Sequence, residues 1–279
     1  QFIQKSKKDK NLELELNFNE QLLDQKKFES VFNKLTFSKT NNGLGLKKTI
    51  IQQLDIYLKS ENKSRSRMTI LNEQAIKKYW LGIEIDDSDF ILEEKEKLEK
   101  YDDNDYHFRI NLSKELSKEN FLEKNKSLLK ANNTNKYYRL KNRYSISSPD
   151  ELFKFDLTTV KQGYGSNLKQ SKTLNCSPRY EIEIEYNNQK ETQKSEEEIL
   201  KELIQYIYLI LSILNKSQQL LSQNKIDEIL NEYDKLVEVK KNDNFFIAAN
   251  PITLHKQNLI KSDTIKNLYN KYGVSLKAD

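Results

Sequence analysis

The sequence predicts an α+β fold in which an antiparallel β-barrel is flanked by helices. The first observation is that segments alternating between apolar and polar residues recur across residues 12–186, as strands with one buried face do. The second is that turn residues separate these segments from residue 136 onward. The third is a pair of helical patterns after residue 195. Many strands joined by turns, with few helices, favour an antiparallel sheet or barrel.

The amino-terminal half mixes strand patterns with helical patterns. The strand patterns are expected at residues 12–18, 50–58, 66–71 and 108–112. The helical patterns, which are also rich in charge, are expected at residues 19–35, 72–80 and 113–130. This half is therefore expected to contribute both strands to the sheet and helices to its surface.

The strand signal is stronger after residue 136. Residues 137–147, 152–162 and 179–186 all alternate between apolar and polar side chains. Residues 147–150 and 163–167 are rich in Ser, Pro, Asp, Gly and Asn, which are the residue types that form tight turns. Three such strands in succession predict antiparallel neighbours in one sheet.

Two helices are expected to complete the domain. Ser195 is placed to cap the first helix, and Glu198 stands at the position that completes a capping box. Apolar residues then recur at helical spacing through residues 199–214. A second helix is expected at residues 225–237. Because the composition changes near residue 240, we expect one domain over residues 1–240 and a separate region over residues 241–279.

Composition excludes several classes of protein. The net charge is +5, from 47 basic and 42 acidic residues, and this mild excess permits a polyanionic partner without requiring one. One cysteine and two histidines exclude an internal disulfide framework and a zinc site of the Cys/His kind. Cys176 is expected to be structural, because no histidine lies near it in the sequence.

No segment is expected to cross a membrane or to direct secretion. The longest apolar run, residues 204–214, has about half of the ~20 residues that a spanning helix needs, so it predicts a buried helix. No secretory signal is recognised at the amino end, and the first residue is not Met, so the start of the natural chain is expected to be missing. A cytoplasmic protein is expected.

Three strands carry charge of one sign on one face. Side chains alternate along a strand, so the members of each set share a face and lie roughly 6.5–7 Å apart. The sets are Glu13 and Glu15; Arg139, Lys141 and Arg143; and Glu181, Glu183 and Glu185. Taken singly, each set is explained by a solvated strand face. Together they favour a barrel with an acidic wall and a basic wall, because a charged lining is costly unless something binds there.

The two walls indicate a particular chemistry. Carboxylate oxygens suit a hard divalent cation, Mn²⁺ or Mg²⁺. Arginine binds phosphate oxygens through two parallel hydrogen bonds, and lysine binds them as a point charge. A divalent cation together with basic side chains around phosphate is the apparatus of phosphoryl transfer, which needs positioning and charge neutralisation.

The same segments resemble a known family. The paired glutamates of "LELELNF", the "YRLKNRYSI" and "FKFDLTTV" strands and the terminal "EIEIE" are similar to those of the triphosphate tunnel metalloenzymes. The resemblance is specifically to the RNA 5′-triphosphatases at the amino end of poxvirus- and giant-virus-type mRNA capping enzymes, and it covers roughly residues 10–190. It implies a β-barrel tunnel that removes the γ-phosphate of RNA with the help of Mn²⁺ or Mg²⁺.

The resemblance also implies roles for individual residues. The metal would be held by the glutamates of the first and last strands, which are Glu13, Glu15, Glu181, Glu183 and, with a weaker match, Glu185. The substrate phosphates would be bound by basic side chains, which are Arg67 (with Arg65 as the alternative), Arg109, Arg139, Lys141, Arg143 and Lys161. Asp156 lies on the same strand as Lys161 and has an open role. One departure is that Asn17 stands where cellular relatives often have a lysine.

The end of the chain carries a second resemblance. "YGVSLKAD" at residues 272–279 resembles the Lys-x-Asp-Gly motif of mRNA guanylyltransferases, ending before its glycine. The match makes Lys277 the residue that would attack the α-phosphate of GTP, and Lys277 would be inactive in this fragment because the nucleotide pocket is absent. Downstream guanylyltransferase and methyltransferase domains would then be partners in the same enzyme.

The expected function is that of a polynucleotide 5′-phosphatase acting on 5′-triphosphate RNA, with NTP as a further substrate. A viral factory, a cytoplasmic genetic element or a virion would be its location. One alternative is the same fold acting on small triphosphates such as thiamine triphosphate or polyphosphate, or cyclising ATP. Another is an RNA-binding or scaffold module without catalysis, which would bind RNA but release no phosphate.

Overall fold

The structure is a computed structural model that describes residues 1–37, 48–58, 64–116, 127, 129 and 134–237. Contacts between residues divide the chain into two units, residues 1–223 and 224–279, which are treated separately below. The expected boundary near residue 240 and Lys277 lie at or beyond the end of the described residues, so both stay predictions.

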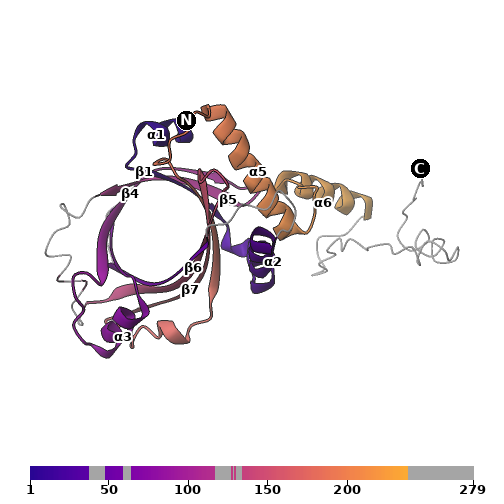
Figure 1. Cartoon of the computed structure of the whole chain (residues 1–279). Helices are drawn as coiled ribbons and strands as arrows, with labels where there is room; N and C mark the ends of the chain where they lie inside the picture. The colour runs from indigo at the N-terminus through magenta and orange to yellow at the C-terminus, as the bar shows by residue number, and fades with distance from the viewer. Residues whose placement is uncertain (38–47, 59–63, 117–126, 128, 130–133, 238–279) are drawn as a thin grey trace. The chain divides into compact units, whose positions relative to one another are not determined.

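Eight antiparallel strands close into a barrel in the first unit, which Figure 1 shows as a ring seen along its axis. The order around the ring is β1-β5-β4-β3-β2-β6-β7-β8, and β8 pairs with β1 to close it. The strands are β1 (Leu12–Phe18), β2 (Lys48–Leu58), β3 (Ser64–Ile70), β4 (Phe90–Asp103), β5 (Phe108–Leu116), β6 (Lys136–Ser147), β7 (Phe153–Gly165) and β8 (Arg179–Tyr186). The predicted fold class, an antiparallel barrel with flanking helices, is confirmed.

Several expected elements differ from the structure in extent. β4 has no counterpart in the prediction, because "EEKEKLEK" at residues 93–100 carries charge on both faces and shows no alternation. Residues 113–116, predicted as the start of a helix, continue strand β5. β7 also runs to Gly165, three residues past its predicted end. In these segments the secondary structure is set by pairing with a neighbouring strand, although the local sequence pattern does not predict a strand.

The outer face of the barrel wall is apolar and is covered by helices. Leu14 and Leu16 of β1 and Ile182 and Ile184 of β8 are at most 3% exposed, and they belong to one buried cluster with apolar residues of three helices. Those helices are α1 (Phe2–Lys8), α2 (Gln25–Phe37) and α5 (Glu196–Asn215). In Figure 1, α1, α2 and α5 lie outside the ring, on the side of β1 and β5.

A second apolar cluster lies elsewhere on the outside of the barrel. Leu54 and Ile56 of β2 and Met68 and Ile70 of β3 are fully buried, and they pack with helix α3 (Glu73–Leu81). The helix begins with Asn72, whose side chain accepts a hydrogen bond from the Ala75 amide. The hydrophobic core of this unit therefore lies between the barrel wall and its helices, which leaves the lumen free for polar side chains.

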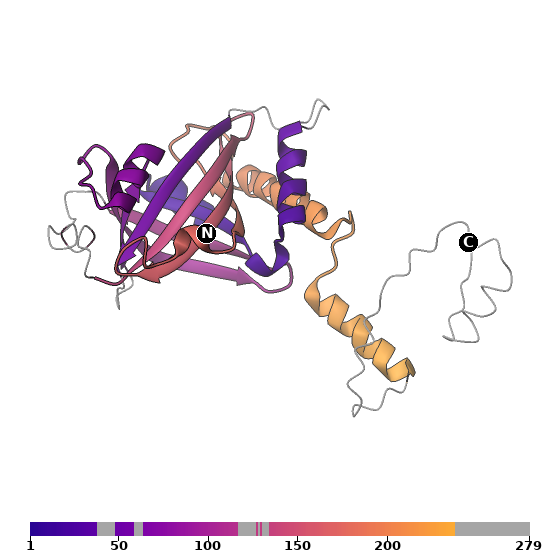
Figure 2. The ribbon, with the colours of Figure 1, turned by 90° about the horizontal axis from the view of Figure 1, so that it is seen from below.

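Figure 2 shows the strands running obliquely along the wall of the barrel. Two short 3-10 helices, η1 (Glu20–Leu22) and η3 (Thr173–Asn175), lie in the connections before α2 and β8. The segment that contains η3 packs closely on β7: a Cβ at Gly163 would come within 2.3 Å of the Ser171 carbonyl oxygen. Only glycine leaves room for the Ser171 backbone at that position.

The predicted helices at the end of the domain are confirmed. Ser195 and Glu198 form the expected capping box at the start of α5, and Ile207, Ile210 and Leu211 of the expected buried run pack into the core. In the second unit, α6 (Gln223–Val237) matches the helix predicted at residues 225–237. Among the described residues, no helix combines the length and the apolar content needed to span a membrane.

Candidate active site in the barrel lumen

The lumen of the barrel is lined by polar side chains from alternate positions of the strands. Residues that pair directly across two antiparallel strands point to the same face. The register pairs Glu15 with Glu185 and Asp156 with Glu183, and it pairs Asp55 with Arg139. The charged sets predicted on separate strands therefore share one interior surface.

Most of the charged lining opens into one cavity of about 730 Å³. Both carboxylates and basic side chains line it, so that it is neither acidic nor basic as a whole. Its charged lining residues are Lys10, Glu13, Glu15, Arg67, Glu93, Lys95, Arg143, Lys154, Asp156, Glu183 and Glu185. A charged interior of this size is costly to maintain and is typical of a site for a polar ligand.

Glu13 and Glu15 share Lys95, which reaches them from β4. Lys95 Nζ lies 2.7 Å from Glu15 Oε1 and forms an ion pair with Glu13 as well. Burial and the adjacent Glu15 carboxylate raise the pKa of Glu13 to about 8. Burial also acts to raise the pKa of Glu15, but the Lys95 ammonium outweighs it and lowers the pKa to about 2. One glutamate of the pair is thus readily protonated while the other stays charged.

The two remaining carboxylates of this group come from β8. Burial, followed by the charge of Glu15, raises the pKa of Glu183 to about 7, and Glu185 forms an ion pair with Lys154. Within the described residues, no three His, Cys, Asp or Glu side chains are already gathered closely enough to hold a metal ion. The donor chemistry nevertheless fits a hard cation, because the carboxylates of Glu13, Glu15, Glu183 and Glu185 line one cavity. Burial and then the charge of Glu15 raise the pKa values of Glu13 and Glu183, so added positive charge is favourable there.

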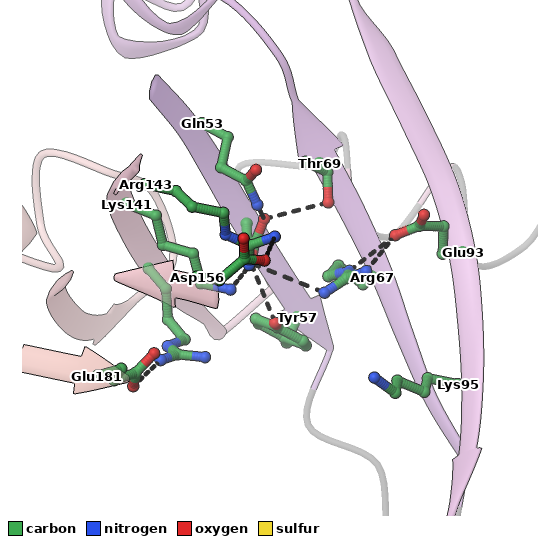
Figure 3. A network of polar contacts seen from close by, with 12 residues as sticks. Gln53, Tyr57, Arg67, Thr69, Glu93, Lys95, Lys141, Arg143, Asp156 and Glu181 are labelled. Atoms are coloured by element: carbon green, nitrogen blue, oxygen red, sulfur yellow. Dashed lines mark hydrogen bonds and ion pairs between the residues drawn. The ribbon is translucent and has the colours of Figure 1, made fainter. Parts of the chain in front are cut away.

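The basic side chains converge on Asp55, which is fully buried. Lys141 Nζ lies 2.6 Å from Asp55 Oδ2, and the side chains of Gln53 and Thr69 donate hydrogen bonds of 2.8 and 3.1 Å to Oδ1. The dashed lines of Figure 3 trace this network. Burial acts to raise the pKa of Asp55, but the charges of Lys141 and Arg67 hold it well below its usual range. Asp55 therefore fixes the position of the basic wall.

Arg67 and Arg143 keep hydrogen-bonding capacity in spite of their partners. Arg67 Nε donates a 2.9 Å hydrogen bond to Glu93, and Arg143 Nη1 lies 3.3 Å from Asp156 Oδ2. Over the part of the chain that the structure describes, the buried Arg143 Nε and Thr158 Oγ1 have no hydrogen-bond partner. A buried donor without a partner is costly, and an anion in the lumen would satisfy it.

Arg139 and Glu181 lie at the other end of the strands and form an ion pair with each other. They line a different cavity of about 460 Å³, together with Tyr57, Tyr137 and Tyr164. Glu181 is thus on the predicted face, but it does not line the cavity that Glu183 and Glu185 line. We therefore leave it out of the carboxylate group proposed to bind the metal.

Two other predicted residues, Arg109 and Lys161, do not line the main cavity. Arg109 faces the lumen near its end, where it is 48% exposed and pairs with Asp102. Lys161 pairs in register with Leu140 on the outer face, and its Nζ donates a 2.9 Å hydrogen bond to the Leu174 carbonyl. Lys161 therefore points away from the lumen, because it is an odd number of positions along β7 from inward-facing residues such as Asp156. The side chain of Arg65 lies outside the described residues.

The sequence prediction missed several charged residues on the strands that line the lumen. They include Asp55, Glu93, Lys95 and Lys154. Asp55 shares a strand face with Gln53, and Lys154 shares one with Asp156, so the alternation of these strands was a usable signal. Lys95 gave no such signal, because β4 has charged residues on both faces.

Comparison with known proteins places this architecture among known folds. No family model and no curated protein sequence matches the chain. A solved RNA triphosphatase domain of a trifunctional mimivirus mRNA capping enzyme is similar, with 17% identity, 77% of this chain and 94% of that chain covered, and a TM-score of 0.57. A monoclinic form of the mimivirus capping enzyme triphosphatase gives 19% identity, 75% and 94% coverage, and a TM-score of 0.56. The chain has the triphosphate tunnel fold.

At these identities the likeness concerns the fold alone. The tunnel fold supplies a closed barrel with an inward-facing position on every second residue of each strand. In this chain those positions hold a carboxylate group on β1 and β8 and a basic group on β3 and β6. The two groups face one lumen.

Proposed function

We propose that this chain is a metal-dependent RNA 5′-triphosphatase that removes the γ-phosphate of 5′-triphosphate RNA. The observation that carries the proposal is one cavity that is lined by the carboxylates of β1 and β8 and by the basic side chains of Arg67, Lys95, Arg143 and Lys154. A triphosphate brings several negative charges close together, and it needs cations on most of its oxygens. The likeness to the mimivirus RNA triphosphatase domain supports the same assignment.

The carboxylates that would hold the metal ion are Glu13, Glu15, Glu183 and Glu185. A bound Mn²⁺ or Mg²⁺ supplies Lewis acidity that neutralises charge on the phosphate oxygens. Lys95 contacts both Glu13 and Glu15. With these carboxylates bound to a metal ion, the Lys95 ammonium would be available for phosphate.

The chain's basic residues would bind the substrate. Arg143 offers a buried donor without a partner among the described residues, and Arg67 lines the same cavity. Thr158, which pairs with Arg143 across β6 and β7, also has a buried hydroxyl without a described partner. Lys141 is held by Asp55 between the two ends of the lumen, so it is positioned before the substrate arrives. A water molecule then attacks the γ-phosphorus in line with the leaving oxygen, and a glutamate of β8 accepts its proton.

The direct test measures phosphate release from γ-labelled triphosphate RNA in the presence of Mn²⁺, Mg²⁺ or EDTA. We expect release with one or both metals and none with EDTA. Glu15→Gln should remove the activity. Lys161→Ala, which also removes one unit of charge but on the outer face, should leave the activity unchanged. RNA binding without any metal-dependent release would contradict the proposal and favour a scaffold module.

We further propose that the domain is the amino-terminal part of a capping enzyme, with residues 241–279 leading into a guanylyltransferase domain. The support is the sequence resemblance around Lys277 and the capping enzyme to which the mimivirus domain belongs. A viral factory, another cytoplasmic genetic element or a virion is the corresponding location.

This wider assignment has its own test. An extended protein that includes the downstream domain should form a covalent adduct with α-labelled GTP, and Lys277→Ala should abolish the adduct. The 279-residue chain alone should release phosphate but take up no label. An extended protein with an active triphosphatase and no label would separate the tunnel domain from capping.

A further inference from the structure

Three tyrosines form a row at the end of the lumen that lies away from the carboxylate group. Tyr57, Tyr137 and Tyr164 pair directly with one another across β2, β6 and β7, so all three point to the lumen side. The rings of Tyr137 and Tyr164 are stacked with centroids 4.5 Å apart, and those of Tyr57 and Tyr137 are 6.1 Å apart. These three residues are called the tyrosine row below.

The tyrosine row is open to solvent at its outer end. Tyr164 is 73% exposed, and all three residues line the 460 Å³ cavity that also contains Arg139 and Gln162. An aromatic side chain of this size normally buries most of its surface in a core or at an interface. A stack that faces water at the entrance of a polar lumen is therefore a surface for a flat ligand.

The tyrosine row continues directly into the basic wall. On β6, Tyr137 is followed by Arg139, Lys141 and Arg143 on the same face, at intervals of about 6.6 Å along the strand. A nucleotide chain that enters past the tyrosines would bring its 5′-phosphates to these side chains in order. Its bases would remain at the row while its terminal phosphate reaches the cavity with the carboxylates.

Charge alone does not account for this entrance. Arg139 is paired with Glu181, and the nearby Arg179 lies 3.1 Å from Glu20. Both arginines thus have carboxylate partners, although the buried Arg139 Nε has no hydrogen-bond partner among the described residues. Stacking on aromatic rings needs no free charge, and it accepts any base, because every base has a π-face. The aromatic rings are thus the feature of this entrance that is best suited to hold RNA.

We propose that Tyr57, Tyr137 and Tyr164 bind the first bases of a single-stranded RNA whose 5′-triphosphate lies in the lumen. This inference rests on the proposed triphosphatase function and deepens it, because it makes RNA and nucleotides better substrates than inorganic tripolyphosphate, which has no base. The other reading of the row is that the tyrosines only stabilise the ends of three strands through cross-strand packing.

The test compares Tyr164→Ala and Tyr164→Phe with the wild-type protein on two substrates, a short triphosphate RNA and tripolyphosphate. Loss of a stacked base is worth roughly a 5- to 150-fold change in binding, so we expect the KM for RNA to rise by at least 5-fold in Tyr164→Ala. The KM for tripolyphosphate should not change, and Tyr164→Phe should restore RNA binding because it keeps the ring. Tyr101→Ala is the matched control, since Tyr101 is 49% exposed and pairs with Ile110 on the outer face.

Each contrary result has a distinct meaning. An equal rise in KM for both substrates would assign the row to strand packing, and an unchanged KM for RNA would place the bases elsewhere. Binding of the same RNA in EDTA, followed by fluorescence anisotropy, tests the row even without turnover. If wild-type protein binds RNA through Tyr164 but releases no phosphate from either substrate, the triphosphatase function fails and the stacking site remains. If RNA binding in EDTA is the same for wild type and Tyr164→Ala, the stacking site fails regardless of turnover.

Discussion

The outer and inner faces of the barrel wall use the same strands in opposite ways. On β8, Ile184 is 1% exposed and packs under the helices, whereas its neighbour Glu183 faces the lumen cavity. The outer face contributes apolar contacts that hold helices α1, α2 and α5 in place. The inner face contributes charged groups that restrain one another through ion pairs.

This difference separates stability from activity within a single strand. Burial of apolar side chains outside the barrel drives folding, while like charges inside it oppose folding in part. Substitutions on the two faces should therefore affect different measurements, even at adjacent positions. Four predictions test this separation, in order of decreasing effect.

The largest effect is expected from removing a lumen carboxylate. Glu183→Ala should lower the rate of phosphate release about 1,000-fold, because a metal ion contributes several kcal/mol to transition-state stabilisation. The melting temperature should stay the same or rise, since the change relieves repulsion with Glu15. Thermal unfolding in EDTA and phosphate release measure the two quantities. A fully active Glu183→Ala protein would remove this residue from the metal site.

The neighbouring outer position should give the opposite result. Ile184→Ala removes a fully buried side chain, so the free energy of unfolding should fall by about 2–5 kcal/mol. The activity per folded molecule should change little. Denaturant unfolding combined with activity at low temperature makes the comparison. A stable Ile184→Ala protein that is catalytically dead would break the separation of the two faces.

Substitutions in the basic wall should have a smaller effect on activity. Arg143→Ala should reduce phosphate release roughly 10- to 100-fold, which corresponds to about 1.5–3 kcal/mol for a hydrogen bond to a charged group. Arg143→Lys should restore only part of the loss, because lysine cannot make two parallel hydrogen bonds to phosphate. Kinetics of both variants check this. If Arg139, Lys141 and Arg143 were all silent when replaced by Ala, the basic wall would have no role in catalysis.

The smallest effect is a pH dependence of stability in the absence of metal. The folded-state pKa values of Glu13 and Glu183 are about 8 and about 7, above the value of 4.5 for free glutamate. Between pH 4.5 and about pH 8 the folded protein binds more protons than the unfolded chain. The free energy of unfolding therefore falls as the pH rises through this range. We expect the free energy of unfolding to be lower at pH 8 than at pH 5.

Denaturant unfolding at pH 5, 6, 7 and 8 in EDTA measures this loss. Glu13→Gln should flatten the curve, because an amide does not titrate, and a saturating amount of Mn²⁺ should restore stability at pH 8. Wild-type stability that does not change over this range would show that the lumen carboxylates do not repel one another as described.

Much of the lumen could be predicted from period-two alternation. "LELEL", "YRLKNRY" and "EIEIE" give both the strands and the faces on which their charges lie. The same rule could have excluded Lys161, because Lys161 and Asp156 are an odd number of residues apart and face opposite sides of β7. Lys95 could not be found in this way, because its strand shows no apolar face.

The sequence by itself determined that strands with one apolar and one charged face would form a barrel with helices packed outside. That information is local, since it depends only on which residues alternate. Only the tertiary structure decided that Glu181 belongs with Arg139 and the tyrosine row, while Glu183 and Glu185 belong with Glu13, Glu15 and Lys95. These groupings depend on strand register and on closure of the barrel between β1 and β8, which bring together residues far apart in the chain and which no local pattern encodes.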